Sequence, residues 1–200
     1  MRGCARSRAF TLVELMFAMG LAALLGLVLS QMLASSLRLY AKGQARANLQ
    51  AAGLMALSHL GRDLRSAAGA TVSVWQAPEG DVSRAVAAVS CRPDERAGEI
   101  SPYAPSQQHV IVFLDRRSGR LIRTTRPVEG TGVRLSERDL RDACEVVQPD
   151  ERVICAHVSG LKPSLEPTGI DIGLALEHTV RDGIVAHETV QTHVAFRNRL

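Results

Sequence analysis

The chain has 200 residues, of which 46% are hydrophobic, 22% charged and 4% aromatic. This composition is typical of a folded chain of one or two domains, and it excludes a disordered, collagen-like or disulfide-dense protein. The net charge of +4 includes three arginines among the first nine residues, and the rest of the chain holds 21 basic and 20 acidic side chains. A polyanion-binding domain needs a clustered excess of Lys and Arg. The composition therefore does not favour nucleic acid as a partner.

An uncharged apolar segment lies near the start of the chain. Residues 15–37 carry no charged side chain, and residues 15–29 carry no polar side chain. These 23 residues are long enough to cross a ~30 Å hydrocarbon core as a helix. A secretory signal peptide has a shorter apolar core that ends at a small-residue cleavage site, whereas this run continues into Ser30 and Gln31. We therefore predict a retained transmembrane helix over residues 10–37, in contact with membrane lipid.

The residues at the start of this helix form a motif. A basic leader ends at Ala9, and residues 10–14 read Phe-Thr-Leu-Val-Glu. This combination resembles the class III signal of type IV pilins and pseudopilins. The resemblance implies that prepilin peptidase removes residues 1–9 by cutting between Ala9 and Phe10 on the cytoplasmic side of the membrane. It also implies N-methylation of Phe10. Ala9 stands where the family usually has Gly.

Glu14 is the only acidic residue among the first 62. An unpaired acidic side chain at the centre of a membrane helix costs up to ~2.5 to 3.5 kcal/mol, so a cationic partner would stabilise it. The resemblance names that partner as the N-terminal amine of a neighbouring subunit, in a filament or at its assembly platform. Glu14 is thus predicted to act in assembly. The alternative is a carboxylate that reaches the cytoplasmic headgroups and has no further role.

The helix is predicted to continue beyond the membrane with a different character. No proline occurs before Pro78, so one helix can extend over residues 10–68. Within residues 38–68, apolar residues recur at steps of three and four, which is the pattern of an amphipathic helix. The residues in this pattern are Leu49, Ala52, Ala56, Leu57, Leu60 and Leu64. We expect this amphipathic half to pack on a globular head.

Short alternating runs replace the helical pattern from residue 69 onward. They predict strands at residues 71–76, 85–91, 109–115, 120–126, 152–158, 169–180 and 186–197. Turns at Gly119 and Gly183 should join two antiparallel hairpins, and Ser136 should cap a short helix over residues 137–144. The predicted fold is α+β, with a long N-terminal helix packed on a mainly antiparallel β-sheet head formed by residues 69–200.

Two further motifs resemble the PilW-type minor pilins. Residues 62–65 read Arg-Asp-Leu-Arg at the end of the helix, and residues 197–199 read Arg-Asn-Arg after the last strand. The resemblance implies a structural subunit that primes or caps assembly of a type IV pilus. It would be a single-pass protein of the inner membrane with its head in the periplasm, and it could reach the pilus tip after assembly. The implied partners are prepilin peptidase, other minor pilins, the major pilin and the inner-membrane assembly platform.

Two other functions fit the same layout. Pseudopilins of type II secretion systems share the helix and the head, and would act at the tip of a secretion piston. A pilus-tip module that binds DNA or a surface is the other alternative. A basic groove on the head would favour that binding module.

The mature chain would keep three of the four cysteines, because Cys4 leaves with the leader. Cys91, Cys144 and Cys155 allow three different pairings. We favour Cys144 with Cys155, because the segment between them has Gln-Pro-Asp-Glu at its centre and folds back readily. Such a bond would contribute about 3 kcal/mol. The alternative is that all three thiols are buried and reduced.

Catalytic and metal motifs are missing from the sequence. It contains no G-x-S-x-G, P-loop, G-x-G-x-x-G or H-E-x-x-H segment, and the cysteines and histidines lack zinc-binding spacings. Of the six histidines, His178, His187 and His193 lie on the last two predicted strands and could cluster in space. Histidines on strands are more often solvent-facing than ligands. We therefore expect neither an enzyme nor a bound cofactor or metal.

Overall fold

The computed structural model describes residues 11–67, 69–78, 84–92, 108–127, 134–147, 149–180, 183 and 185–196. The chain divides into two units, residues 1–43 and residues 44–200.

The first helix, α1 (Leu12–Arg65), has 54 residues and is uninterrupted. Thr11 caps its first turn, since the Thr11 Oγ1 accepts a hydrogen bond of 3.3 Å from the Glu14 N–H. The Thr11 carbonyl accepts another, of 3.2 Å, from the Leu15 N–H. The predicted helix is confirmed over this range, but it is shorter than expected, because Thr11, Ser66 and Ala67 are not helical. The expected end residues, 10 and 68, lie outside the described residues.

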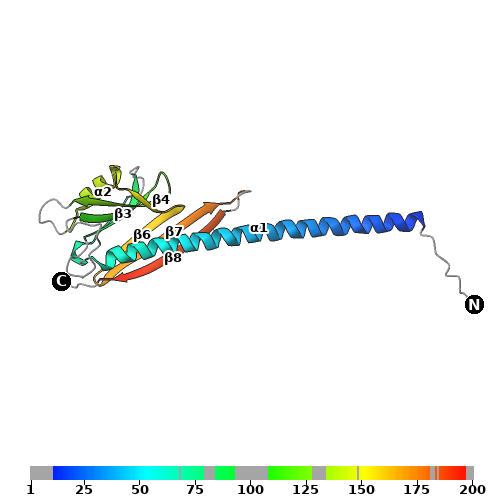
Figure 1. The fold of residues 1–200 in the computed structure, drawn as a ribbon, viewed down its shortest axis with the longest axis horizontal. Coiled ribbons are helices and arrows are strands. Elements are labelled where there is room, and N and C mark those ends of the chain that lie inside the picture. Colours follow the sequence, from blue (N-terminus) through cyan, green and yellow to red (C-terminus); the bar gives the residue numbers. More distant parts are fainter. Residues whose placement is uncertain are drawn as a thin grey trace, which may run out of the picture. The chain divides into compact units, whose positions relative to one another are not determined.

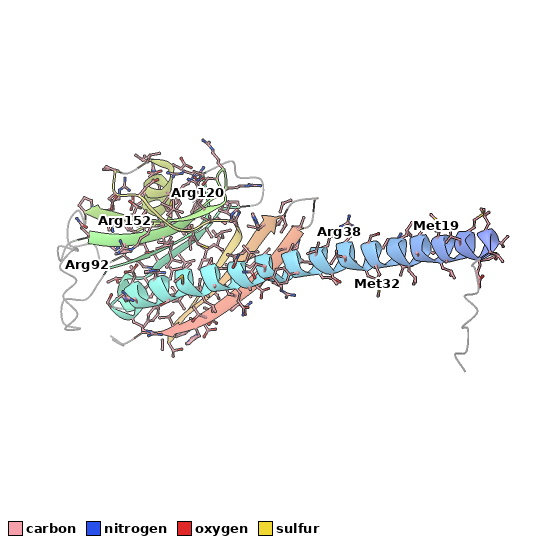
Figure 2. All side chains as sticks on the ribbon, turned by 45° about the vertical axis from the view of Figure 1, so that its right-hand side comes forward. Met19, Met32, Arg38, Arg92, Arg120 and Arg152 are labelled. Atoms are coloured by element: carbon pink, nitrogen blue, oxygen red, sulfur yellow. The ribbon has the colours of Figure 1, made fainter. Side chains whose placement is uncertain are left out.

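The described part of the first unit exposes its apolar side chains. The apolar part of α1 is long enough to cross a membrane, and none of it is buried. Met19 and Met32, for example, project from the helix with exposed fractions of 66% and 63% (Figure 2). Continuous apolar surface of this extent is unfavourable in water. This part of α1 therefore requires lipid or other apolar partners.

The second unit contains two antiparallel sheets and a short helix (Figure 1). The five-stranded sheet has the order β1 (Ser73–Gln76), β2 (Ala85–Cys91), β3 (Gln108–Asp115), β4 (Arg120–Pro127) and β5 (Arg152–Cys155). The three-stranded sheet comprises β6 (Val158–Glu166), β7 (Gly169–Thr179) and β8 (Val185–Ala195). A 3-10 turn, η1 (Gly69–Thr71), precedes β1, and α2 (Glu137–Glu145) lies between β4 and β5 in the chain. The predicted architecture, an apolar helix followed by an antiparallel head, is confirmed.

Both predicted hairpins form. Strands β3 and β4 pair over their whole length across the turn at Gly119, which has a φ of 61°. Strands β7 and β8 pair from Gly169–Ala195 to Thr179–Val185. The Ser136 Oγ accepts a hydrogen bond of 3.2 Å from the Asp139 N–H and thereby caps α2, as the sequence pattern indicates.

The central strand of the five-stranded sheet, β3, is buried on both faces. On one face, Val110 and Val112 of β3 join the larger apolar cluster, which also contains the buried face of α1 and the inner faces of β7 and β8. On the other face, Ile111 and Phe113 pack with Trp75 and with α2. Because both faces of β3 are covered, its sequence is a continuous apolar run rather than an alternating one.

The buried face of α1 packs against the three-stranded sheet (Figure 1). A Cβ added at Gly53 would lie 2.7 Å from Val190 Cγ2 and 3.0 Å from Leu176 Cδ1, so the helix approaches β7 and β8 closely there. About two turns closer to the N-terminus of α1, Arg46 Nε lies 2.5 Å from Glu188 Oε2. Glu188 belongs to the inner face of β8, which is an edge strand of its sheet.

The region around residue 158 differs from the prediction. The expected strand 152–158 is divided into β5 and β6 by a turn at His157, which has a φ of 62°. Strand β6 was not predicted, because Gly160 and Pro163 weaken its strand pattern. Proline is tolerated in β6 because this strand lies at the edge of its sheet.

The predicted Cys144–Cys155 bond is not formed in the structure. Cys91, Cys144 and Cys155 are free and buried thiols. Cys144 of α2 lies in the cluster on one face of the five-stranded sheet, whereas Cys155 lies in the cluster on the other face. The sheet therefore separates the two residues, although only ten residues lie between them in the sequence. Burial raises the pKa of Cys144 to about 12 and also raises the pKa values of Cys91 and Cys155.

Candidate functional site

The first turn of α1 is the strongest candidate site in the described chain. Glu14 lies in this turn, where the positive end of the helix dipole favours an acidic side chain. Its backbone N–H is the group that the Thr11 Oγ1 caps. The predicted cleavage residues, Ala9 and Phe10, lie outside the described residues.

Thr11, which was not predicted as a site residue, caps the turn that contains Glu14. The signal for it is present, since Thr11 and Glu14 match the Thr-x-x-Glu pattern of a capping box. The cap satisfies one of the N–H groups that the first turn of a helix leaves without an intrahelical partner. Glu14 therefore has two separable properties, namely its place in the helix cap and the charge of its carboxylate.

The surroundings of Glu14 are apolar and exposed. Val13, Leu15 and Phe17 have exposed fractions of 63%, 56% and 72%. In an apolar medium, the Glu14 carboxylate is the strongly polar group that these described residues present to a neighbouring helix. The arrangement suits lateral association of α1 with apolar helices, in a register selected by one charge.

The Arg-Asp-Leu-Arg segment at the end of α1 has a structural explanation. Asp63 accepts a hydrogen bond of 2.9 Å from Arg123 Nε of β4, and Leu64 is buried in the core. Burial opposes the charge of Arg123, but the hydrogen bond and the charge of Asp63 outweigh it and raise the Arg123 pKa. These contacts attach the helix end to the five-stranded sheet and leave Arg62 and Arg65 exposed.

Arg62 and Arg65 line a surface groove of about 1050 Å³ between α1 and β8. Leu54 and Phe196 add apolar surface to this groove, and His193 of β8 also lines it. None of the described residues that line the groove is acidic. Its chemistry suits an anionic ligand better than a cationic one.

A charged cluster at the β3–β4 turn has a structural role. Arg84 makes two hydrogen bonds of 2.8 Å to Glu151 and an ion pair of 3.2 Å with Asp115. Burial opposes ionisation of Asp115, but hydrogen bonds from Ser118 and from the Arg117 N–H, together with Arg84, lower its pKa. These side chains satisfy one another and tie the start of β2 to the turn and to the segment before β5.

Comparison with known families identifies the N-terminal segment. The prokaryotic N-terminal methylation motif matches residues 4–30, a range that includes Ala9, Phe10 and Glu14. Searches of curated proteins and of solved structures gave no match. The motif implies processing by prepilin peptidase and contact with pilus assembly machinery. Together with the exposed apolar helix, it supports anchoring in a membrane. The chain thus carries the signal and the helix-plus-head architecture of a type IV pilin-like protein.

Proposed function

We propose that this protein is a minor pilin that primes or caps assembly of a type IV pilus. The observation that carries the proposal is the methylation motif at residues 4–30, which leads into an apolar helix with one acidic side chain, Glu14, in its first turn. The second unit contains the end of this helix and the folded head. In the proposed orientation, residues 10–37 cross the inner membrane and the head lies in the periplasm.

In the proposed mechanism, prepilin peptidase first frees the N-terminal amine of Phe10. The exposed apolar side chains of α1 then pack with the helices of other pilins, where burial replaces contact with lipid. Glu14 pairs with the N-terminal amine of a neighbouring subunit, which fixes the register between the two helices. The head has no catalytic part in this scheme, and its role is to present a surface to the other minor pilins.

We expect cleavage between Ala9 and Phe10, followed by methylation of Phe10. Mass spectrometry of the N-terminal peptide from the membrane fraction should find N-methylated Phe10 as its first residue. Cells that lack prepilin peptidase should retain the leader and provide the control. An intact Met1 terminus in cells with active peptidase would contradict the processing step.

Deletion of the gene tests the function as a whole. Loss of surface pili and of twitching, with secretion intact, is the outcome expected for a minor pilin. Loss of secretion with pili intact would instead indicate a pseudopilin of a type II secretion system. Complementation with the full chain should restore the lost property.

The groove lined by Arg62 and Arg65 favours one second candidate, a pilus-tip module that binds an anionic polymer such as DNA. The same deletion distinguishes it. A tip-binding module would leave pili and twitching in place and abolish DNA uptake or surface adhesion. A priming subunit would lose all of these together.

A further inference from the structure

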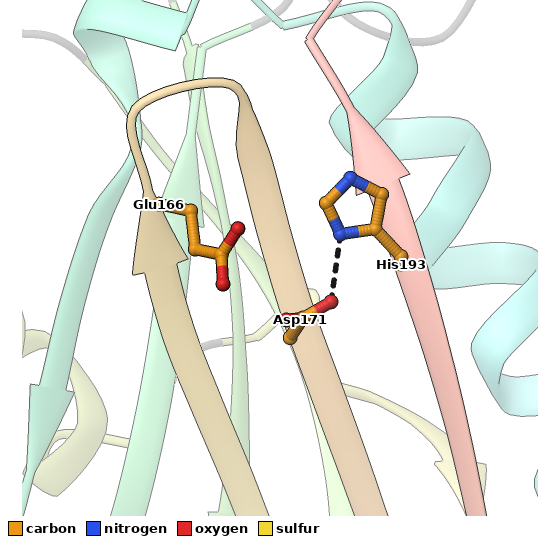
Figure 3. A group of neighbouring side chains, drawn as sticks. All are labelled: Glu166, Asp171 and His193. Atoms are coloured by element: carbon orange, nitrogen blue, oxygen red, sulfur yellow. Dashed lines mark hydrogen bonds and ion pairs between the residues drawn. The ribbon is translucent and has the colours of Figure 1, made fainter.

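Three side chains meet on the outer face of the three-stranded sheet, at the end nearest the β6–β7 turn (Figure 3). Asp171 of β7 and His193 of β8 are direct cross-strand partners, and His193 Nδ1 lies 2.7 Å from Asp171 Oδ1. Glu166, the last residue of β6, approaches from the neighbouring strand. One oxygen or nitrogen atom from each of the three side chains lies within 4.8 Å of the other two.

The register of the strands places these three side chains on the same face of the sheet. Ile170 and Ile172 point into the core, so Asp171 between them must point outward. The same alternation directs His193 outward beside the buried Val194. The three side chains therefore come from rigid strand positions and not from a loop that would have to fold around a ligand.

Gly169 makes room for the imidazole ring. A Cβ added at this residue would lie 2.9 Å from both Cε1 and Nε2 of His193, and 2.5 Å from the Val194 carbonyl oxygen. Any other residue at this position would displace the ring or the strand. The absence of a side chain at Gly169 thus permits the position that His193 occupies.

The electrostatics of the group are unbalanced. Two carboxylates lie beside a single imidazole, so acidic side chains outnumber the basic one in this group. Asp171 interacts with His193, whereas the Glu166 carboxylate has no hydrogen bond or ion pair within the described part of the chain. Lys162 lines the same side of the sheet but forms no ion pair with either carboxylate there. A cation is the ligand that would offset this charge.

We propose that Glu166, Asp171 and His193 bind a divalent transition-metal ion, with Zn²⁺ as the best match. Imidazole nitrogen and carboxylate oxygen are typical zinc ligands, whereas Ca²⁺ and Mg²⁺ prefer sites made of oxygen alone. The half-exposed side chains leave further coordination positions to water. A bound ion would join the ends of β6 and β8 across β7. This inference is independent of the proposed role in pilus assembly.

A matched control lies on the same two strands. His187 and Glu177 are also cross-strand partners on the outer face, with 3.6 Å between His187 Nδ1 and Glu177 Oε2. No third ligand completes a group with them among the described residues. This pair therefore reproduces the local chemistry of Asp171 and His193 without a Glu166 counterpart.

Zinc binding to the full chain in detergent, with any affinity tag removed, is the test. Calorimetric titration with Zn²⁺ should give one ion per chain. His193→Ala and Glu166→Gln should each weaken binding by at least about tenfold, and His187→Ala should leave it unchanged. Thermal unfolding without metal should be the same for all variants, because the replaced side chains are exposed.

Four results would contradict the proposed zinc site. No zinc uptake by the wild type would overturn the proposal, as would uptake that Glu166→Gln leaves unchanged, since binding would then need only a surface His–Asp pair. Equal weakening by His187→Ala would mean that histidines bind zinc non-specifically. Tighter binding of Ca²⁺ than of Zn²⁺ would overturn the assignment to a transition metal.

Discussion

Glu14→Gln should leave membrane insertion and leader cleavage intact and should reduce recovery of the protein with its partner pilins by at least about tenfold. Glutamine can still occupy its place in a helix cap, so the start of α1 should be preserved. The charge is lost, and with it the attraction to a neighbouring N-terminal amine in an apolar medium, where removing one member of an ion pair is costly. Co-purification or crosslinking with the other minor pilins is the measurement.

Two further variants separate the charge of Glu14 from its place in the cap. Thr11→Ala removes the hydroxyl that accepts the Glu14 N–H but keeps the carboxylate, so it should assemble normally if charge is decisive. Glu14→Val removes the charge and makes the span more apolar, so it should insert in the membrane, be cleaved and fail to assemble. Normal assembly of Glu14→Gln alongside failure of Thr11→Ala would show that the carboxylate matters only through the helix start.

Gly53→Ala should destabilise the head by up to about 2 kcal/mol. The added methyl group would meet Val190 at 2.7 Å and Leu176 at 3.0 Å, and such overpacking costs about 1–3 kcal/mol. The better helix propensity of alanine returns up to about 1 kcal/mol of this. Denaturant unfolding of the full chain in detergent can be followed by fluorescence, because Trp75 is the only tryptophan and is buried in the head.

Gly61→Ala is the matched control. Gly61 is also a buried glycine of α1, but its added Cβ would lie 3.8 Å from Val194 Cγ2, which is an ordinary contact. This variant should be neutral or gain up to about 1 kcal/mol from helix propensity. Equal stability of the two variants would mean that Val190 moves aside at little cost, and that close approach of the helix to β8 is not required.

The elements that sequence could predict are those whose signals are local. The β3–β4 and β7–β8 hairpins each combine apolar strands with a glycine turn, and α2 begins at a serine cap. Strand β6 escaped prediction because Pro163 is acceptable only at a sheet edge, and whether a strand lies at an edge depends on the tertiary fold. The division of the head into two sheets has the same cause, since no local pattern reports which strands share a sheet.

Contacts between side chains that are distant in the sequence were harder to predict. The short segment between Cys144 and Cys155 favours a disulfide only if both ends reach the same face of a sheet, and the structure places them on opposite faces. Glu166, Asp171 and His193 lack a metal-binding spacing because three different strands contribute them. The role of Glu14 stays a prediction that rests on the contiguous motif at residues 10–14, and the same five residues contain the Thr11 cap.

The inward charge of Glu188 affects how the head behaves before it meets a partner. Strand β8 has eleven residues and a free edge, which would ordinarily invite pairing with a strand of another molecule. Glu188 points toward the helix side and forms an ion pair with Arg46 there, so a strand added at this edge would have to remove this ion pair from water. The heads should therefore resist edge-to-edge aggregation. Subunits would then stay separate until α1 associates with other helices.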